Sequence, residues 1–287
     1  MAINWFPGHM AKTRRLISEN IKKVDAVVEL ADARIPESSR NPILPELLGE
    51  KKRLLLLNKS DMADPAANDR WQSYYEKQGL RTLLCDSMSG KGVNRLPAAL
   101  QELLHEKIER DAAKGMTRAI KIMVVGVPNV GKSSFINKMS GRKAAKVEDR
   151  PGVTRDKQWI RLESGIELLD TPGILWPKFE DQEVGYKLAY TGAIKDDVVD
   201  VEDVACRLLK HLAGSYPALV IERYKLNATP EKLDEYEGWE ILEGVGRRRG
   251  FLISGGEVNY ERTARMVLDE FRGVKIGRIT LELPGRA

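Results

Sequence analysis

The sequence predicts an α/β fold with a mainly parallel sheet, followed by an α-helical domain. Short apolar runs at residues 24–30, 53–57 and 82–85 are too short for helices, and polar or helical stretches separate them. This alternation is typical of a parallel sheet flanked by helices. After Pro177 the apolar residues recur at helical spacing, which predicts a second, helical domain over 178–287.

The first domain, residues 1–177, is expected to begin with an amphipathic helix over 9–23. An apolar helical pattern from Val93 to Leu104 predicts a later helix, and the polar stretch 106–118, which has no apolar period, is expected to be a helix end and linker. The basic residues near the first helix are Lys12, Arg14, Arg15, Lys22 and Lys23.

A second strand-rich segment follows that linker. The run 120–125 predicts a strand, and a glycine-rich turn leads from it into a helix over 132–139. Residues 140–157 are expected to form a long loop. The runs 158–162 and 166–169 predict a pair of strands.

Composition favours a cytoplasmic globular protein. The chain has 287 residues, 42% of them hydrophobic, which is enough to bury a full core. No apolar run approaches the roughly 18 residues of a membrane span, and the N-terminal segment does not resemble a signal peptide. Cys85 and Cys206 lack metal-ligand spacing, so neither a zinc site nor a disulfide is expected. The net charge of +5 is weak evidence for a polyanionic partner.

Residues Gly126 to Ser133 match the phosphate-binding pattern GxxxxGK[ST] between a predicted strand and a predicted helix. Glycines let backbone N–H groups point at phosphate oxygens, Lys132 supplies a positive charge, and the Ser133 hydroxyl suits Mg²⁺. The alternative is a chance match, which the strand and helix context disfavours. The expected nucleotide contacts are Asn129, Val130, Gly131, Lys132, Ser133 and Ser134.

The tetrapeptide Asn58-Lys59-Ser60-Asp61 follows a predicted strand and indicates a guanine-reading motif. A carboxylate at Asp61 can accept hydrogen bonds from N1–H and the 2-amino group of guanine, whereas adenine leaves it unpaired. The alternative is an ordinary turn with a helix cap.

Three further segments complete the predicted site. Asp170 ends a predicted strand and is expected to hold Mg²⁺ through a water, and the Gly173 N–H is expected to sense the γ-phosphate. Thr154 lies in the long loop and can offer a hydroxyl to Mg²⁺. The alternative for Asp170 is a strand-ending turn.

The tripeptide Asp86-Ser87-Met88 follows another predicted strand. Its backbone N–H groups are expected to face the guanine oxygen, with Ser87 supporting the turn.

The guanine motif precedes the phosphate loop, which reverses the usual order. With Trp5-Phe6-Pro7-Gly8-His9-Met10 and Asp32-Ala33-Arg34-Ile35-Pro36 in front, the chain resembles the circularly permuted GTPases, and in particular the bacterial ribosome biogenesis GTPase A family. The resemblance covers nearly the whole chain. It implies a circularly permuted P-loop GTPase domain in which 106–118 joins the old termini.

The resemblance also bears on catalysis. Ile174 stands where Ras-like enzymes have a glutamine, so hydrolysis is expected to be slow until ribosomal particles stimulate it. In the family, the histidine that matches His9 is implicated in hydrolysis; the alternative is that His9 only caps or packs the first helix. Related GTPases with asparagine at the position of Asn129 often use K⁺; the alternative is that Asn129 suits the turn.

The resemblance implies that the partners are the large ribosomal subunit precursor and 23S rRNA, bound in part by the helical domain. Neither a membrane nor DNA is expected as a partner. A signalling or transport GTPase, and an RNA-binding protein without turnover, remain as alternatives. The basic residues of the helical domain could also be solvated helix faces; they are Arg247, Arg248, Arg249, Arg262, Arg265, Arg272, Lys275 and Arg278.

Overall fold

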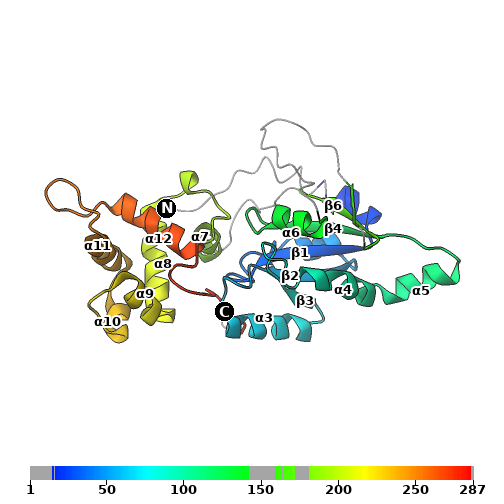
Figure 1. Cartoon of the computed structure of the whole chain (residues 1–287), viewed down its shortest axis with the longest axis horizontal. Coiled ribbons are helices and arrows are strands. Elements are labelled where there is room, and N and C mark those ends of the chain that lie inside the picture. The colour runs from blue at the N-terminus through cyan, green and yellow to red at the C-terminus, as the bar shows by residue number, and fades with distance from the viewer. Residues whose placement is uncertain (1–14, 16, 142–158, 163, 172–180, 286–287) are drawn as a thin grey trace. The chain divides into compact units, whose positions relative to one another are not determined.

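The computed structural model describes residues 15, 17–141, 159–162, 164–171 and 181–285, which form two compact units (Figure 1). The α/β unit contains the described residues up to Thr171 and also 282–285, and the helical unit contains 181–281. The sequence-based division assigned everything from 178 to 287 to the helical domain. The structure differs at the C-terminal end, where the chain returns to the α/β unit.

A six-stranded sheet with the order β3-β2-β1-β4-β6-β5 forms the centre of the α/β unit. All neighbouring strands pair in parallel except β5 and β6, which pair antiparallel. Every apolar run that predicted a strand forms one, within about two residues at each end. The strands are β1 (Ala26–Asp32), β2 (Lys52–Asn58), β3 (Arg81–Leu84), β4 (Ile120–Gly126), β5 (Trp159–Arg161) and β6 (Ile166–Asp170).

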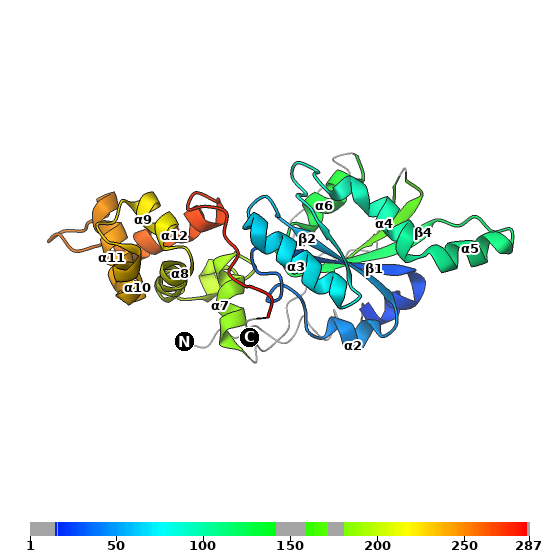
Figure 2. The ribbon, with the colours of Figure 1, turned by 90° about the horizontal axis from the view of Figure 1, so that it is seen from below.

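Helices cover both faces of this sheet. Figure 2 shows α4 (Leu96–Leu103) and α6 (Lys132–Met139) on the side away from α2 (Leu44–Leu48). On the α2 side, Ile17 packs with the buried side chains of α2 and the sheet. Helix α3 (Pro65–Lys77) buries Trp71 and Tyr75 in a cluster with apolar side chains of β2. β1 is buried throughout and β2 along most of its length, which explains their nearly continuous apolar sequences.

The predicted first helix is only partly described. Residues 15 and 17–20 are helical and lead into the 3-10 turn Ile21–Lys23, while 9–14 lie outside the described residues. The buried side chain of Ile17 fixes this segment to the sheet.

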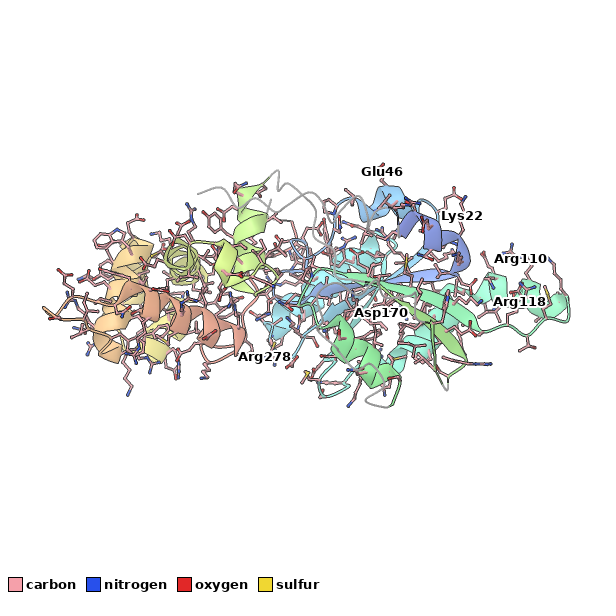
Figure 3. All side chains as sticks on the ribbon, turned by 90° about the horizontal axis from the view of Figure 1, so that it is seen from above. Lys22, Glu46, Arg110, Arg118, Asp170 and Arg278 are labelled. Atoms are coloured by element: carbon pink, nitrogen blue, oxygen red, sulfur yellow. The ribbon has the colours of Figure 1, made fainter. Side chains whose placement is uncertain are left out.

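The predicted helix end and linker at 106–118 is more helical than expected. Most of it is helix α5 (His105–Ala113), and only the residues after it connect to β4 without regular structure. Helix α5 buries none of its residues and contains one large apolar residue, Ile108, so its sequence predicts a helix end and not a separate helix. Figure 3 shows Arg110 of α5 and Arg118 of the connection after it, both away from Asp170.

The helical unit is built around α8 (Val201–Ser215), whose apolar stripe is buried on neighbouring helices. Asp200 caps α8 by accepting hydrogen bonds from the backbone N–H groups of Glu202 and Asp203. The surrounding helices are α7 (Gln182–Tyr190), α9 (Pro217–Tyr224), α10 (Pro230–Glu235), α11 (Gly238–Arg249) and α12 (Tyr260–Arg272).

Among the described residues, no helix combines the length and the apolar character that a bilayer span requires.

Candidate functional site

Four strands deliver the predicted motifs to one edge of the sheet. β2 ends at Asn58, β4 at Gly126 and β6 at Asp170, and β3 leads into Asp86. These strands run parallel, so their carboxyl ends lie at the same edge. In open α/β sheets this is the edge at which ligands bind.

Asn58 joins three of the motifs directly. Its side-chain Nδ2 donates to the Val130 carbonyl oxygen at 2.7 Å. Its Oδ1 accepts from the Ser87 hydroxyl at 2.8 Å and from the Ser87 backbone N–H at 3.0 Å. Asn58 is 2% exposed, so these bonds form away from water. One side chain therefore fixes the phosphate loop and the Asp86–Ser87–Met88 turn relative to β2.

Lys59 forms a second link to the phosphate loop. Its backbone is in the left-handed region (φ +59°), and its ammonium donates to the Asn129 carbonyl oxygen at 2.7 Å. The same ammonium lies 3.0 Å from the Asp32 carboxylate.

Two hydrogen bonds that involve the backbone of Ser60 anchor the rest of this tetrapeptide. The Ser60 backbone N–H donates to the Cys85 carbonyl oxygen at 3.1 Å, and Asn68 of α3 donates to the Ser60 carbonyl oxygen at 2.9 Å. Asp61 is exposed. The anchored turn thus leaves the Asp61 carboxylate accessible to a ligand.

The phosphate loop has the tight backbone that its glycines predict. Asn129 and Gly131 are both in the left-handed region, with φ values of +56° and +96°. A Cβ added to Gly131 would lie 2.3 Å from Asn58 Nδ2, so only glycine fits beside that side chain. Helix α6 starts at the next residue, and its first N–H groups are available for an anion.

Lys132 is a largely buried cation at the start of α6. Burial lowers its pKa to about 8, although the Asp170 carboxylate opposes that change. Its ammonium donates to the Thr171 carbonyl oxygen. A phosphate beside this ammonium would favour the charged form, as expected of a polyphosphate-binding lysine.

Two of the three predicted Mg²⁺ residues, Ser133 and Asp170, lie on elements that meet at this edge. Ser133 and Ser134 are in the first turn of α6, and Asp170 ends β6 (Figure 3). The described residues contain no group of three or more His, Cys, Asp or Glu side chains that could hold a metal by themselves. One hydroxyl and one carboxylate nevertheless fit Mg²⁺, which binds few protein ligands and keeps water and phosphate oxygens.

The turn after β3 differs from its expected geometry. The Ser87 N–H donates to Asn58, and the Met88 N–H donates to Asp86 Oδ1 at 2.8 Å. Both N–H groups donate within the chain in this structure, and their expected donation to guanine stays a prediction. The Met88 side chain is 79% exposed beside them.

Three predicted residues, His9, Thr154 and Gly173, lie outside the described residues, as does Ile174. Their predicted roles stay predictions.

The structure adds two residues that the motifs did not identify as part of the site. Asp32 ends β1 beside β2, and Arg34 pairs with it. The available signal was the segment Asp32-Ala33-Arg34-Ile35-Pro36, whose acidic first residue ends a buried strand that neighbours the Asn58 strand.

Comparison with known proteins gives the family. A family model described as a 50S ribosome-binding GTPase matches residues 121–225. A ribosome biogenesis GTPase A from Priestia megaterium is 50% identical over 289 residues, covering 100% of this chain and 99% of the relative. The chain belongs to the ribosome biogenesis GTPase A family. The ribosome biogenesis GTPase A of Thermotoga maritima is 31% identical, covering 98% of this chain and 95% of the relative.

Solved structures support the same assignment. A GDP-bound structure of YlqF matches with a TM-score of 0.66 and 26% identity, covering 95% of this chain and 100% of that chain. A GNP-bound structure of YlqF from T. maritima matches with a TM-score of 0.65 and 26% identity, covering 96% and 100%. As a member of this family, the chain is a GTPase with a circularly permuted P-loop domain, and both predictions are confirmed.

Proposed function

We propose that this GTPase assists late assembly of the large ribosomal subunit in the cytoplasm and binds immature particles in a nucleotide-dependent way. The observation that carries the nucleotide part is the Asn58 side chain, which bonds both to the phosphate loop and to the turn after β3. The names of the relatives support the ribosomal part: they include several ribosome biogenesis GTPases A and the mitochondrial ribosome-associated GTPase 1 of Mus musculus, which is 36% identical.

The nucleotide lies, in this proposal, along the carboxyl edge of the sheet. Asp61 accepts from the guanine base, and Asn58, Lys59 and Ser60 hold the turn that presents it. Asp86, Ser87 and Met88 border the base. Backbone N–H groups around Gly131 and the ammonium of Lys132 receive the phosphates.

Mg²⁺ is assigned to Ser133 and Asp170, with Thr154 as a further hydroxyl ligand. Bound there, the ion neutralises charge on the β- and γ-phosphates. Ser133 contributes its hydroxyl from the first turn of α6, and Asp170 contributes a carboxylate through water. Removing Mg²⁺ with a chelator is expected to abolish turnover.

K⁺ is assigned to Asn129, the exposed residue of the phosphate loop with a left-handed backbone. A monovalent cation near the phosphates offsets charge that an arginine finger offsets in other GTPases. Turnover is expected to fall when K⁺ is replaced by Na⁺ at constant ionic strength. Equal turnover in the two salts would remove K⁺ from the mechanism.

Catalysis without a glutamine is assigned to His9, which orients the attacking water, and to Gly173, whose N–H senses the γ-phosphate. Ile174 cannot orient water, so turnover is slow until a particle binds. His9→Ala is expected to lose particle-stimulated turnover and to keep GTP binding. His105→Ala is a matched control, because His105 is exposed on α5 and pairs there with Glu109.

Contact with 23S rRNA is assigned to the helical unit. Its basic side chains differ in whether they form ion pairs within the unit. Arg272 pairs with Asp196, and Arg249 pairs with Glu270, so both are used within the unit. Arg248 and Lys275 are exposed. Charge removal at this exposed pair is expected to weaken particle binding and to flatten its salt dependence.

Cosedimentation with large-subunit particles tests the proposed function. More chain is expected to pellet with a non-hydrolysable GTP analogue than with GDP, in a salt-sensitive way, and the same particles should accelerate phosphate release. Equal pelleting under both nucleotides would indicate a signalling or transport GTPase with another partner. Binding without multiple turnovers would indicate an RNA-binding protein.

A further inference from the structure

Asp32 is a buried carboxylate placed directly beside the guanine motif. It ends β1 and pairs in register with Asn58, the last residue of β2. The Asp32 side chain is 3% exposed, and its Oδ2 lies 3.0 Å from the Lys59 ammonium. A carboxylate this buried is retained only with strong partners, because burial favours its neutral form.

Arg34 supplies the main partner. Its Nε donates to Asp32 Oδ1 at 2.9 Å and its Nη2 donates to Oδ2 at 2.7 Å, which is a two-point pair. The Arg34 backbone N–H adds a third bond to Oδ1 at 3.0 Å. These bonds fix both the position and the rotation of the Asp32 carboxylate.

The Asp32–Arg34 pair belongs to a cluster of four side chains of alternating charge: Lys59, Asp32, Arg34 and Asp61. Burial raises the pKa of Asp32, but the charges of Arg34 and Lys59 outweigh it and hold that pKa well below its usual range. Burial lowers the pKa of Arg34, whereas Asp32 and the charge of Asp61 raise it. Lys59, Asp32, Arg34 and Asp61 therefore interact electrostatically across the whole guanine motif.

Lys59 is the member of this charged cluster that contacts the phosphate loop. A lysine ammonium sits on a flexible four-carbon stem, so a single hydrogen bond to the Asn129 carbonyl leaves it much freedom. Asp32 gives the ammonium a second, charged partner on the opposite strand. Because Asp32 holds the Lys59 ammonium in place before the nucleotide arrives, less side-chain entropy is lost when the nucleotide binds.

We propose that Asp32 and Arg34 are positioning residues of the guanine site: Arg34 fixes the Asp32 carboxylate, and Asp32 holds the Lys59 ammonium against the phosphate loop. The inference rests on the proposed assignment of Asn58–Asp61 to guanine. It predicts an effect on nucleotide affinity, because the pair supports the empty site and touches no reacting atom. GTP and GDP should be affected by the same factor, since both place guanine at this edge.

A double-mutant cycle with Lys59 tests the proposal. Asp32→Asn is expected to raise the dissociation constants of GDP and GTP by about tenfold each, with kcat at saturating GTP unchanged. In a Lys59→Met background, Asp32→Asn should add less than about twofold. A full further tenfold loss in that background, or no loss in the wild-type background, overturns the proposal.

Two additional variants keep the test interpretable. Asp32→Asn combined with Arg34→Gln replaces the ion pair by an amide pair, so no unpaired charge is buried if the single variant fails to fold. The same tenfold loss of nucleotide affinity is expected. Asp25→Asn, just before the other end of β1, is the control: Asp25 pairs with Lys107 and should leave nucleotide affinity unchanged.

Failure of the underlying assignment gives a different result. Asp61→Asn should weaken GDP and strengthen xanthosine diphosphate. If it does neither, Asn58–Asp61 does not read guanine and both proposals fall. If it does both while Asp32→Asn leaves the affinities unchanged, only the positioning role is overturned.

Discussion

The indole Nε1 of Trp71 donates a 2.9 Å hydrogen bond to the carbonyl oxygen of Glu282, 211 residues further along the chain. The Glu282 carboxylate accepts from the backbone N–H groups of Glu37 at 2.8 Å and Ser38 at 3.2 Å, and also from the Ser38 hydroxyl. The residues that follow the helical unit are therefore built into the α/β unit. The helical unit is connected to the α/β unit at both of its ends.

Glu282→Ala should release this C-terminal attachment. The variant loses charged hydrogen bonds to two backbone N–H groups, which is expected to lower the stability of the α/β unit by about 2 kcal/mol. Protease cleavage of the 282–285 segment, followed by mass spectrometry, should become faster. Glu235→Ala, an exposed acid on α10, should leave the cleavage rate unchanged. Equal rates for both variants would show that Glu282 does not hold the segment.

Gly131→Ala should abolish nucleotide binding and preserve the fold. The added Cβ would lie 2.3 Å from Asn58 Nδ2 at a φ of +96°. Gly141→Ala is matched in backbone strain, since Gly141 has a φ of +64°, but has open space around it. It should cost about 1 kcal/mol of stability and no nucleotide affinity. The measurement is titration with a fluorescent GDP analogue, and comparable affinities for the two variants would be incompatible with the loop geometry.

Asn58→Ala should weaken GDP binding by about 2 kcal/mol, roughly 30-fold, because it leaves buried groups of Ser87 and Val130 without their partner. Ser87→Ala removes only the hydroxyl bond and should cost about fivefold. Calorimetric titration with GDP shows which of the two variants loses more affinity. A larger loss of GDP affinity for Ser87→Ala would mean that Asn58 is not the main connection between the two loops.

Asp196→Asn should weaken the helical unit in a pH-dependent way. Hydrogen bonds from Arg272 hold the pKa of Asp196 below its ordinary value of 3.8 despite partial burial. A lowered acid pKa contributes stability above that value and loses it as the pH falls through the folded pKa. At pH 7 the variant should be about 1 kcal/mol less stable, and the difference should shrink below about pH 4.

Hydrogen exchange of α7 and α12 measures this difference, because Arg272 also donates to the Tyr190 and Ala189 carbonyl oxygens. Asp197→Asn is the control, since Asp197 is adjacent and exposed. A difference between wild type and Asp196→Asn that persists unchanged in acid would exclude the ion pair as its cause.

Most of the fold could be predicted because its strands are short and the central ones are strongly apolar and buried on both faces. The helix 132–139 was also predictable, since a phosphate loop fixes its start. Helix α5 could not be predicted as a separate helix, because it buries no residue and has one large apolar side chain, Ile108. The return of Glu282 to the α/β unit depends on contacts across more than 200 residues, which local sequence patterns do not encode.

The site residues also differ in whether local sequence patterns could identify them. Motif spacing identified Asn58, Lys132 and Asp170, because each lies next to a strand or helix with a strong pattern. The positions of Asp32 and Arg34 follow from the register of β1 against β2, which the sequence does not specify. The internal bonds of the Ser87 and Met88 N–H groups likewise appear only when Asn58 and Asp86 are placed beside them.

The most direct test of the account is phosphate release by Asp61→Asn with GTP and with xanthosine triphosphate, each in the presence of large-subunit particles. An asparagine at 61 no longer matches the donors of guanine but can donate to the 2-oxo group of xanthine. The account predicts that GTP turnover is lost, that xanthosine triphosphate restores particle-stimulated turnover, and that sedimentation with particles follows xanthosine triphosphate. Unchanged GTP turnover, or particle binding that ignores the nucleotide switch, would contradict it.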